Sequence, residues 1–299
     1  MLPTIAKSPG SNKDYVLVKV IEREFDIEGL HIHAREWGEH GIPVLALHGW
    51  LDNAASFDAL GELLAGVHFL AIDLPGHGLS DNKPAHATYQ IWDDLLVILA
   101  VADAMGWDEF VLLGHSRGAI MSMLLAAACP ERIQSLVCLD GLIPGPLTID
   151  ESAIQLGKFL KDYRNIGARK PRIFSSIDDI VTARRRVMPM GEAAARKISE
   201  RAAIKTETGF IWNNDPRLKA ASAFKLSEEH LRVMLSAHAV PVLLVLAEDG
   251  FARFSQLLDF ASCIDNCRVV HLSGSHHFHM EEAAVEIAEL VSYFLRANA

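Results

Sequence analysis

A serine between two glycines is the clearest chemical signal in the sequence. The pentapeptide Gly114-His115-Ser116-Arg117-Gly118 has the form G-x-S-x-G; an apolar run, Phe110–Leu113, precedes it, and a helix-forming stretch, Ala119–Ala128, follows it. A serine at a sharp turn from strand to helix stands exposed above the edge of a sheet, and flanking glycines leave room where the two backbones nearly touch. We therefore predict that Ser116 is a catalytic nucleophile.

A nucleophile of this kind needs hydrogen-bond donors for the negative oxygen that forms during acyl transfer. The helix after Ser116 begins with free N–H groups and the positive end of its dipole, so the backbone N–H of Arg117 is one predicted donor. The second is expected from the loop after an earlier strand, where Leu47-His48-Gly49-Trp50 offers the N–H of Trp50. The alternative is that His48-Gly49 is simply a turn that ends a strand.

Apolar strands and helices alternate along most of the chain, and they would position these groups. Six apolar runs are bounded by turn residues: Val44–Leu47, Phe69–Ile72, Phe110–Leu113, Leu136–Leu139, Val242–Leu246 and Arg268–Leu272. Stretches of helical composition occupy Asp93–Met105, Ala119–Ala128 and Glu281–Leu295, and two strands, Tyr15–Ile21 and Leu30–Trp37, open the chain as a hairpin. This pattern predicts a doubly wound, mostly parallel α/β sheet that is covered on both faces.

The alternation stops between Gly141 and Val240, where no buried strand is evident. Helices are predicted there instead, at Ser152–Asn165, Ile177–Val187, Glu192–Ile204 and Ser227–Ala237. A segment of this length is too long for a loop. We therefore expect a core made of residues 1–141 and 240–299, with an inserted helical cap at residues 142–239.

The predicted cap is basic, although the whole chain carries a net charge of −10. Lys158–Lys205 holds 13 Lys+Arg against 5 Asp+Glu, and the densest point is Arg184-Arg185-Arg186. Two interpretations are open. The charges form a solvated helix face, or they draw in an anionic substrate.

Three motifs, in this order, resemble the α/β-hydrolase superfamily. They are His48-Gly49-Trp50, the run Asp-Leu-Pro-Gly-His-Gly-Leu-Ser at residues 73–80, and Gly114–Gly118. Together with a late histidine, the resemblance covers nearly the whole chain except the predicted cap. Within the superfamily, residues 48–53, 73–81 and 276–280 are similar to the serine hydrolase-like proteins. The resemblance implies an eight-stranded sheet, a triad of serine, acid and histidine, and no cofactor, but it supplies no firm substrate.

Three histidines near the C-terminus compete for the role of general base. The superfamily places there a small residue, the histidine, four further residues and an acidic residue, which selects His276, with Glu281 five positions on. His277 is the alternative, and His279 is explained as a core residue. A histidine cluster also suggests zinc, but no paired carboxylate or cysteine spacing accompanies it. We predict no metal site.

The triad acid must hold the imidazole in the right tautomer, and two strand ends offer a carboxylate. Asp249 follows the strand after which most superfamily members carry the acid, but the usual spacing from the opening proline falls on Gly250. Asp140 lies directly at the end of an earlier strand, a position that some superfamily branches use. We favour Asp140, with Asp249 as the alternative acid and Glu248 as a third choice.

A hydroxyl nucleophile activated by histidine indicates acyl transfer through an acyl-enzyme, so carboxylic esters or thioesters are the expected substrates. Dehalogenases and most epoxide hydrolases of this fold carry aspartate where this chain has Ser116. Trp50, as a pocket wall, would suit an apolar acyl group. Two alternatives stay open: a carbon–carbon bond hydrolase or lyase with the same triad, and a non-catalytic ligand receptor on the same fold.

The composition argues against several other classes of function. An acidic chain lacks the basic surface that general nucleic-acid binding requires. The four cysteines, Cys129, Cys138, Cys263 and Cys267, suggest neither a disulfide framework nor a metal site. No apolar run reaches membrane-spanning length, and the N-terminus lacks the apolar region of a secretory signal. We expect a cytoplasmic enzyme that acts on a small molecule, and the sequence does not indicate an oligomeric state.

Overall fold

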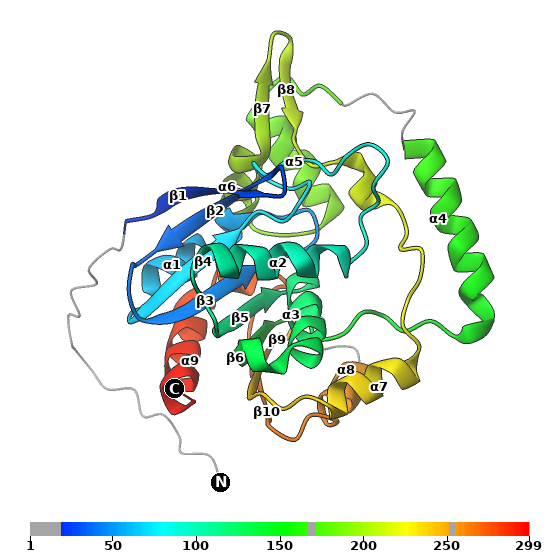
Figure 1. Ribbon diagram of the computed structural model, residues 1–299. Helices are drawn as coiled ribbons and strands as arrows, with labels where there is room; N and C mark the ends of the chain where they lie inside the picture. The colour runs from blue at the N-terminus through cyan, green and yellow to red at the C-terminus, as the bar shows by residue number, and fades with distance from the viewer. Residues whose placement is uncertain (1–18, 167–171, 251–254, 299) are drawn as a thin grey trace.

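An eight-stranded sheet forms the centre of the computed structural model, which describes residues 19–166, 172–250 and 255–298 (Figure 1). The strand order is β1-β2-β4-β3-β5-β6-β9-β10. The bounds are β1 Ile21–Ile27, β2 Leu30–Trp37, β3 Ile42–Leu47, β4 Val67–Ile72, β5 Phe110–His115, β6 Ile133–Leu139, β9 Val242–Ala247 and β10 Cys267–Leu272. β2 runs antiparallel to β1 and β4, and the other neighbouring pairs are parallel. The predicted fold class is confirmed.

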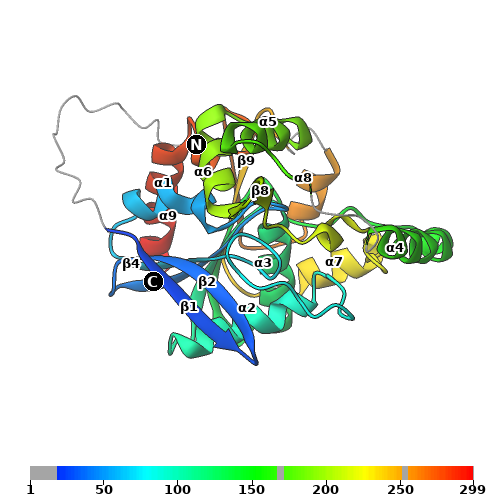
Figure 2. The same ribbon diagram turned by 90° about the horizontal axis from the view of Figure 1, so that it is seen from above.

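Helices cover both faces of the sheet and enclose two apolar cores (Figures 1 and 2). One core contains residues of α2 (Asp93–Ala104), α3 (Arg117–Ala128), α7 (Glu228–Ser236) and α8 (Ser255–Ala261), and the other contains residues of α1 (Asp58–Leu63) and α9 (Ala284–Ala297). Side chains along β3 alternate between the cores, with Leu45 and Leu47 in the first and Val44 and Ala46 in the second. Because both faces are buried, such strands appear in the sequence as continuous apolar runs.

The opening hairpin exists, but its first strand was predicted too early in the chain. β1 begins at Ile21, where the predicted strand Tyr15–Ile21 ends, and residues 15–18 of that prediction lie outside the described residues. The register is set by the tight turn Glu28-Gly29, whose φ angles of 53° and 82° place Ile27 opposite Leu30. The predicted strand followed the valine-rich stretch before β1 and did not use the position of this turn.

The segment from 142 to 239 lies outside the large sheet and is mainly helical. It contains α4 (Ser152–Ile166), α5 (Ile177–Val187), α6 (Glu192–Ala202) and α7, in close agreement with the predicted helices. The prediction was wrong at the end of α6, because β7 (Ala203–Thr206) begins there and pairs with β8 (Gly209–Trp212). The two strands of this hairpin are short and only partly buried, so they do not stand out in the sequence as buried strands. α4 extends along one side of the molecule, with no buried residue (Figure 1).

Within residues 19–166, 172–250 and 255–298, no helix is both long enough and apolar enough to cross a bilayer.

Candidate active site

Ser116 occupies a strained turn between β5 and α3. Its φ of +52° and ψ of −113° are unusual for a residue with a side chain, and such strain is typical of functional positions. The flanking glycines are required by close packing. A Cβ at Gly118 would lie 1.8 Å from the carbonyl oxygen of Leu47, and one at Gly114 would lie 2.4 Å from the backbone nitrogen of Ala119. The turn thus has the geometry that the G-x-S-x-G motif predicts.

His276 and Asp140 meet across the ends of two strands. His276 lies in the turn after β10, and its Nδ1 is 2.6 Å from Oδ2 of Asp140, which follows β6 and is fully buried. The other carboxylate oxygen accepts the backbone N–H of Ala247 at 3.1 Å. A ring that donates Nδ1–H to a carboxylate keeps its lone pair on Nε2, which is the protonation state that a general base for a serine needs.

Gly250 leaves room for the carboxylate of Asp140. A Cβ at Gly250 would lie 2.0 Å from Oδ2 of Asp140, so the carboxylate of Asp140 occupies the space that a side chain at position 250 would need. Position 250 is also where the spacing usual in the superfamily would place the acid. The neighbouring Asp249 donates its backbone N–H to Gly274, and Glu248 accepts a hydrogen bond from Ser273.

His115 connects the turn at Ser116 with His276. It directly precedes Ser116, and its Nε2 lies 2.8 Å from the backbone carbonyl oxygen of His276, to which it donates. Burial holds the pKa of His115 well below the ordinary value for histidine, so the ring is neutral. The proton on Nε2 then leaves a lone pair on Nδ1. No pattern in the sequence indicates this contact, because the motif accepts any residue before its serine.

Arg184 and Asp52 form a buried ion pair, which also contacts the alternative base, His277. Nη2 of Arg184, from α5, is 2.5 Å from Oδ1 of Asp52, and Nε2 of His277 is 3.2 Å from Oδ2. All three side chains are buried. Burial alone would raise the pKa of Asp52, but the charges of His277 and Arg184 outweigh it and hold that pKa well below its usual value. The structure thus places His277 against Asp52, on a partner different from that of His276.

The same region contains the residues that could hold a metal ion. Asp52, His115 and His277 offer ligand atoms that all lie within 4.8 Å of one another. The carboxylate comes from the loop after β3, far from the histidines in sequence, so their spacing could not reveal it. The guanidinium of Arg184 already provides a cation at the other oxygen of Asp52. The expectation of no metal stays a prediction.

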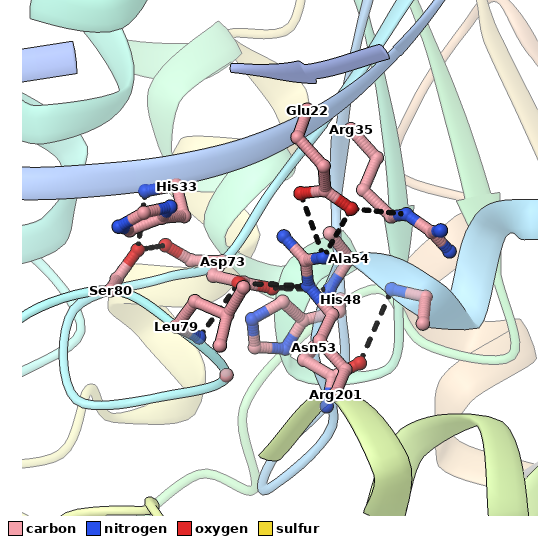
Figure 3. A network of polar contacts seen from close by, with 12 residues as sticks. Glu22, His33, Arg35, His48, Asn53, Ala54, Asp73, Leu79, Ser80 and Arg201 are labelled. Carbon is pink, nitrogen blue, oxygen red and sulfur yellow. Dashed lines mark hydrogen bonds and ion pairs between the residues drawn. The ribbon is translucent and has the colours of Figure 1, made fainter. Parts of the chain in front are cut away.

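Arg201 connects α6 with the core and with the run at residues 73–80 (Figure 3). Its Nε lies 3.0 and 2.9 Å from the two oxygens of Asp73, and its Nη1 lies 2.8 and 2.9 Å from those of Glu22. Asp73 also accepts the backbone N–H groups of Ala54 and Leu79, at 2.7 and 2.9 Å. The aspartate of this run therefore supports two loops and anchors a helix of the inserted segment.

The loop after β3 carries the second predicted oxyanion donor, and His48 fixes its start. Nε2 of His48 accepts the N–H of Leu74 at 3.0 Å, and Nδ1 donates to the carbonyl of Gly49 at 2.7 Å. Trp50 follows, and its indole N–H donates to the carbonyl of Leu218 at 2.9 Å. Trp50 thus touches the inserted segment, and the use of its backbone N–H as an oxyanion donor stays a prediction.

Two adjoining cavities lie at Ser116 and Arg117. The first has a volume of about 320 Å³, is lined mostly by apolar side chains, and includes Ser116, Ile120, Leu142, Ile143, Pro146 and Leu257. The second has a volume of about 260 Å³ and includes Trp50, Tyr89, Trp92, Lys219 and Lys225. Arg117 and Pro144 line both cavities, so the two adjoin at the residue that follows Ser116.

Neither interpretation of the arginine run fits Arg184, because this residue is fully buried. We predict that Arg184→Met destabilises the fold by about 3–5 kcal/mol, because it leaves the charge of Asp52 buried without its cation. Urea unfolding followed by circular dichroism measures the free energy. Arg186→Met is the matched control, since Arg186 is exposed on the same helix and should tolerate the change. Equal effects of the two substitutions would show that the buried pair does not hold α5 in place.

Sequence comparisons agree with this geometry. The sequence profile of the family described as the alpha/beta hydrolase fold matches residues 42–284. A serine hydrolase-like protein of Dictyostelium discoideum is 32% identical over 284 residues, covering 89% of this chain and 79% of that protein. Human serine hydrolase-like protein 2 is 30% identical, covering 90% of this chain and 91% of that protein.

Solved structures show the same fold. A hypothetical protein from Pseudomonas aeruginosa PAO1 has a TM-score of 0.88 and 36% identity, covering 92% of this chain and 99% of its own. The thioesterase domain from the curacin biosynthetic pathway has a TM-score of 0.81 at 24% identity, covering 91% of this chain and 99% of its own. The motifs, their geometry and these relatives together show that the chain belongs to the α/β-hydrolase family, with the serine hydrolase-like proteins among its relatives.

Proposed function

We propose that this protein is a serine hydrolase that cleaves a carboxylic ester or thioester through an acyl-enzyme. The observation that carries the proposal is the 2.6 Å contact between His276 and Asp140, combined with the strained turn at Ser116. This contact prepares the imidazole to accept a proton and stabilises the charge that it then carries. The fold by itself would not favour catalysis over ligand binding.

The proposed reaction has two halves. His276 takes the proton of Ser116 while the serine oxygen attacks the carbonyl carbon, and the negative oxygen is bound by the backbone N–H groups of Arg117 and Trp50. His276 then returns the proton to the departing alcohol or thiol, which leaves the acyl group on Ser116. A water molecule, deprotonated by His276, attacks this ester; the bond to the serine oxygen breaks, the carboxylic acid leaves, and His276 returns the proton to Ser116.

The apolar cavity beside Ser116 supports an apolar acyl group. Side chains of Ile120, Leu142 and Leu257 line it, and they would bury a short hydrocarbon chain attached to the serine oxygen. We further propose that residues 142–239 form the cap of this site and that residues 1–141 and 240–299 form the core. The buried pairs made by Arg184 and Arg201 support this division, because they dock the inserted segment onto the core.

A panel of p-nitrophenyl esters of increasing acyl length tests the proposal. The purified protein should hydrolyse at least the shorter esters and should react with a fluorophosphonate probe, with the label found on Ser116 by mass spectrometry. A folded protein that cleaves no ester or thioester and takes no label would favour the receptor alternative.

A further inference from the structure

The second cavity differs from the first in charge. The charged side chains that line it in the described part of the chain are all cations, namely Arg117, Lys219 and Lys225, and the neighbouring wall is aromatic, with Trp50 and Trp92. Two of these cations, Lys219 and Lys225, have exposed side chains, whereas Arg117 is paired with the buried carboxylate of Asp94. A concave site of one sign attracts ligands of the other sign.

Arg117 is held at the boundary between the two cavities by a buried carboxylate. Its Nη2 is 2.8 Å from Oδ2 of Asp94, whose side chain is 1% exposed. Lys83 lies 2.8 Å from the other oxygen of Asp94, so one buried carboxylate is shared by two cations. The N-terminus of α3, which begins at Arg117, adds a positive dipole end on the same side.

The proposed acyl-enzyme assigns each cavity to one part of the substrate. In the proposed acyl-enzyme the acyl group is bonded to Ser116 and occupies the apolar cavity that this residue lines. The leaving group lies on the opposite side of the scissile bond. The adjoining cavity, which shares Arg117 and Pro144 with the first, is the space available for it.

We infer that the cationic cavity binds an anionic group, a carboxylate or a phosphate, on the alcohol or thiol side of the substrate. This inference rests on the proposed hydrolase function and narrows it to substrates with an apolar acyl group and an anionic leaving group. Lys219 and Lys225 are both exposed at the cavity, so their contribution is a screened attraction that salt weakens.

Matched butyryl esters test the inference. The leaving groups are 3-hydroxybenzoate, 3-hydroxyphenylphosphonate and the neutral 3-hydroxybenzamide. The kcat/KM of the natural protein should be about tenfold higher for at least one anionic ester than for the neutral ester, because Lys219 and Lys225 attract the anion at close range. The carboxylate and phosphonate arms show which anion is preferred. The advantage should shrink in 0.5 M sodium chloride.

Two double variants distinguish binding at this cavity from the electrostatic attraction of the whole protein surface. Lys219→Gln/Lys225→Gln should abolish the anionic advantage, mainly through KM, so that kcat/KM falls about tenfold more for the anionic ester than for the neutral ester. Lys158→Gln/Lys205→Gln removes the same charge from exposed lysines that do not line the cavity, and it should keep the advantage. Equal rates for charged and neutral esters, or equal losses in both double variants, would overturn the inference while the hydrolase function stood.

Failure of the hydrolase proposal would look different, because none of the three esters would be cleaved. Calorimetric binding of the corresponding butyramides, with carboxylate, phosphonate or carboxamide on the ring, then tests the anion site directly. Tighter binding of a charged butyramide, lost only in Lys219→Gln/Lys225→Gln, would support the site. Equal binding of charged and neutral butyramides would contradict it.

Discussion

Ser116→Ala should lose nearly all hydrolase activity, by about a thousandfold or more, as is typical for a member of a catalytic triad. The variant should still fold. The backbone N–H of Ser116 donates to Leu139 at 2.9 Å and its carbonyl accepts from Ile120 at 3.2 Å, and alanine keeps both bonds. Activity on p-nitrophenyl butyrate and thermal unfolding of the same sample measure the two expectations.

A serine in α3, the helix that follows Ser116, provides the control. Ser122 is also buried, but its hydroxyl donates to the carbonyl of Gly118 at 2.9 Å and has no part in the proposed reaction. Ser122→Ala should keep most of the activity and the fluorophosphonate label. Near-normal turnover by Ser116→Ala, or equal losses in both variants, would contradict the role of Ser116.

The sheet was predictable because strands that are buried on both faces have a recognisable sequence pattern. β5 and β9 are buried at every position, so each appears as a continuous apolar run, and the turn residues after them mark the edge where the site lies. The helices α4 and α5 were predictable from composition and length. The β7–β8 hairpin was missed because its strands are short and only partly buried, so the helical composition before them extended the predicted helix into β7.

The site was predictable only in part. Ser116 belongs to a local motif and Asp140 lies directly at a strand end, so short-range patterns were sufficient to propose both residues, and their catalytic roles stay predictions. The support beneath them is tertiary. Asp52 and Arg184 are 132 residues apart, and nothing near either residue in the sequence indicates a buried pair. Arg184 in particular looked like a surface charge, because it shares a basic run with two exposed arginines.

Asp140→Asn should lower kcat by up to about ten-thousandfold, the loss that the same change of the triad acid causes in a serine protease. The structure gives a specific reason. The backbone N–H of Ala247 donates to Oδ1 of Asp140, so an asparagine would place its carbonyl oxygen there and turn its NH₂ group toward Nδ1 of His276. Nδ1 must then be the acceptor, the ring proton moves to Nε2, and the ring cannot take a proton from Ser116.

Asp249→Asn is the matched control, and it should keep a large part of the activity. A greater loss in Asp249→Asn than in Asp140→Asn would reverse the assignment of the acid. An exchange of residues provides a positive test. Asp140 has a φ of +46°, which glycine adopts readily, and its carboxylate fills the space in front of Gly250. Asp140→Gly should therefore fold but be inactive. Adding Gly250→Asp should raise kcat/KM at least about tenfold above that of Asp140→Gly, because the new carboxylate enters the same space beside His276.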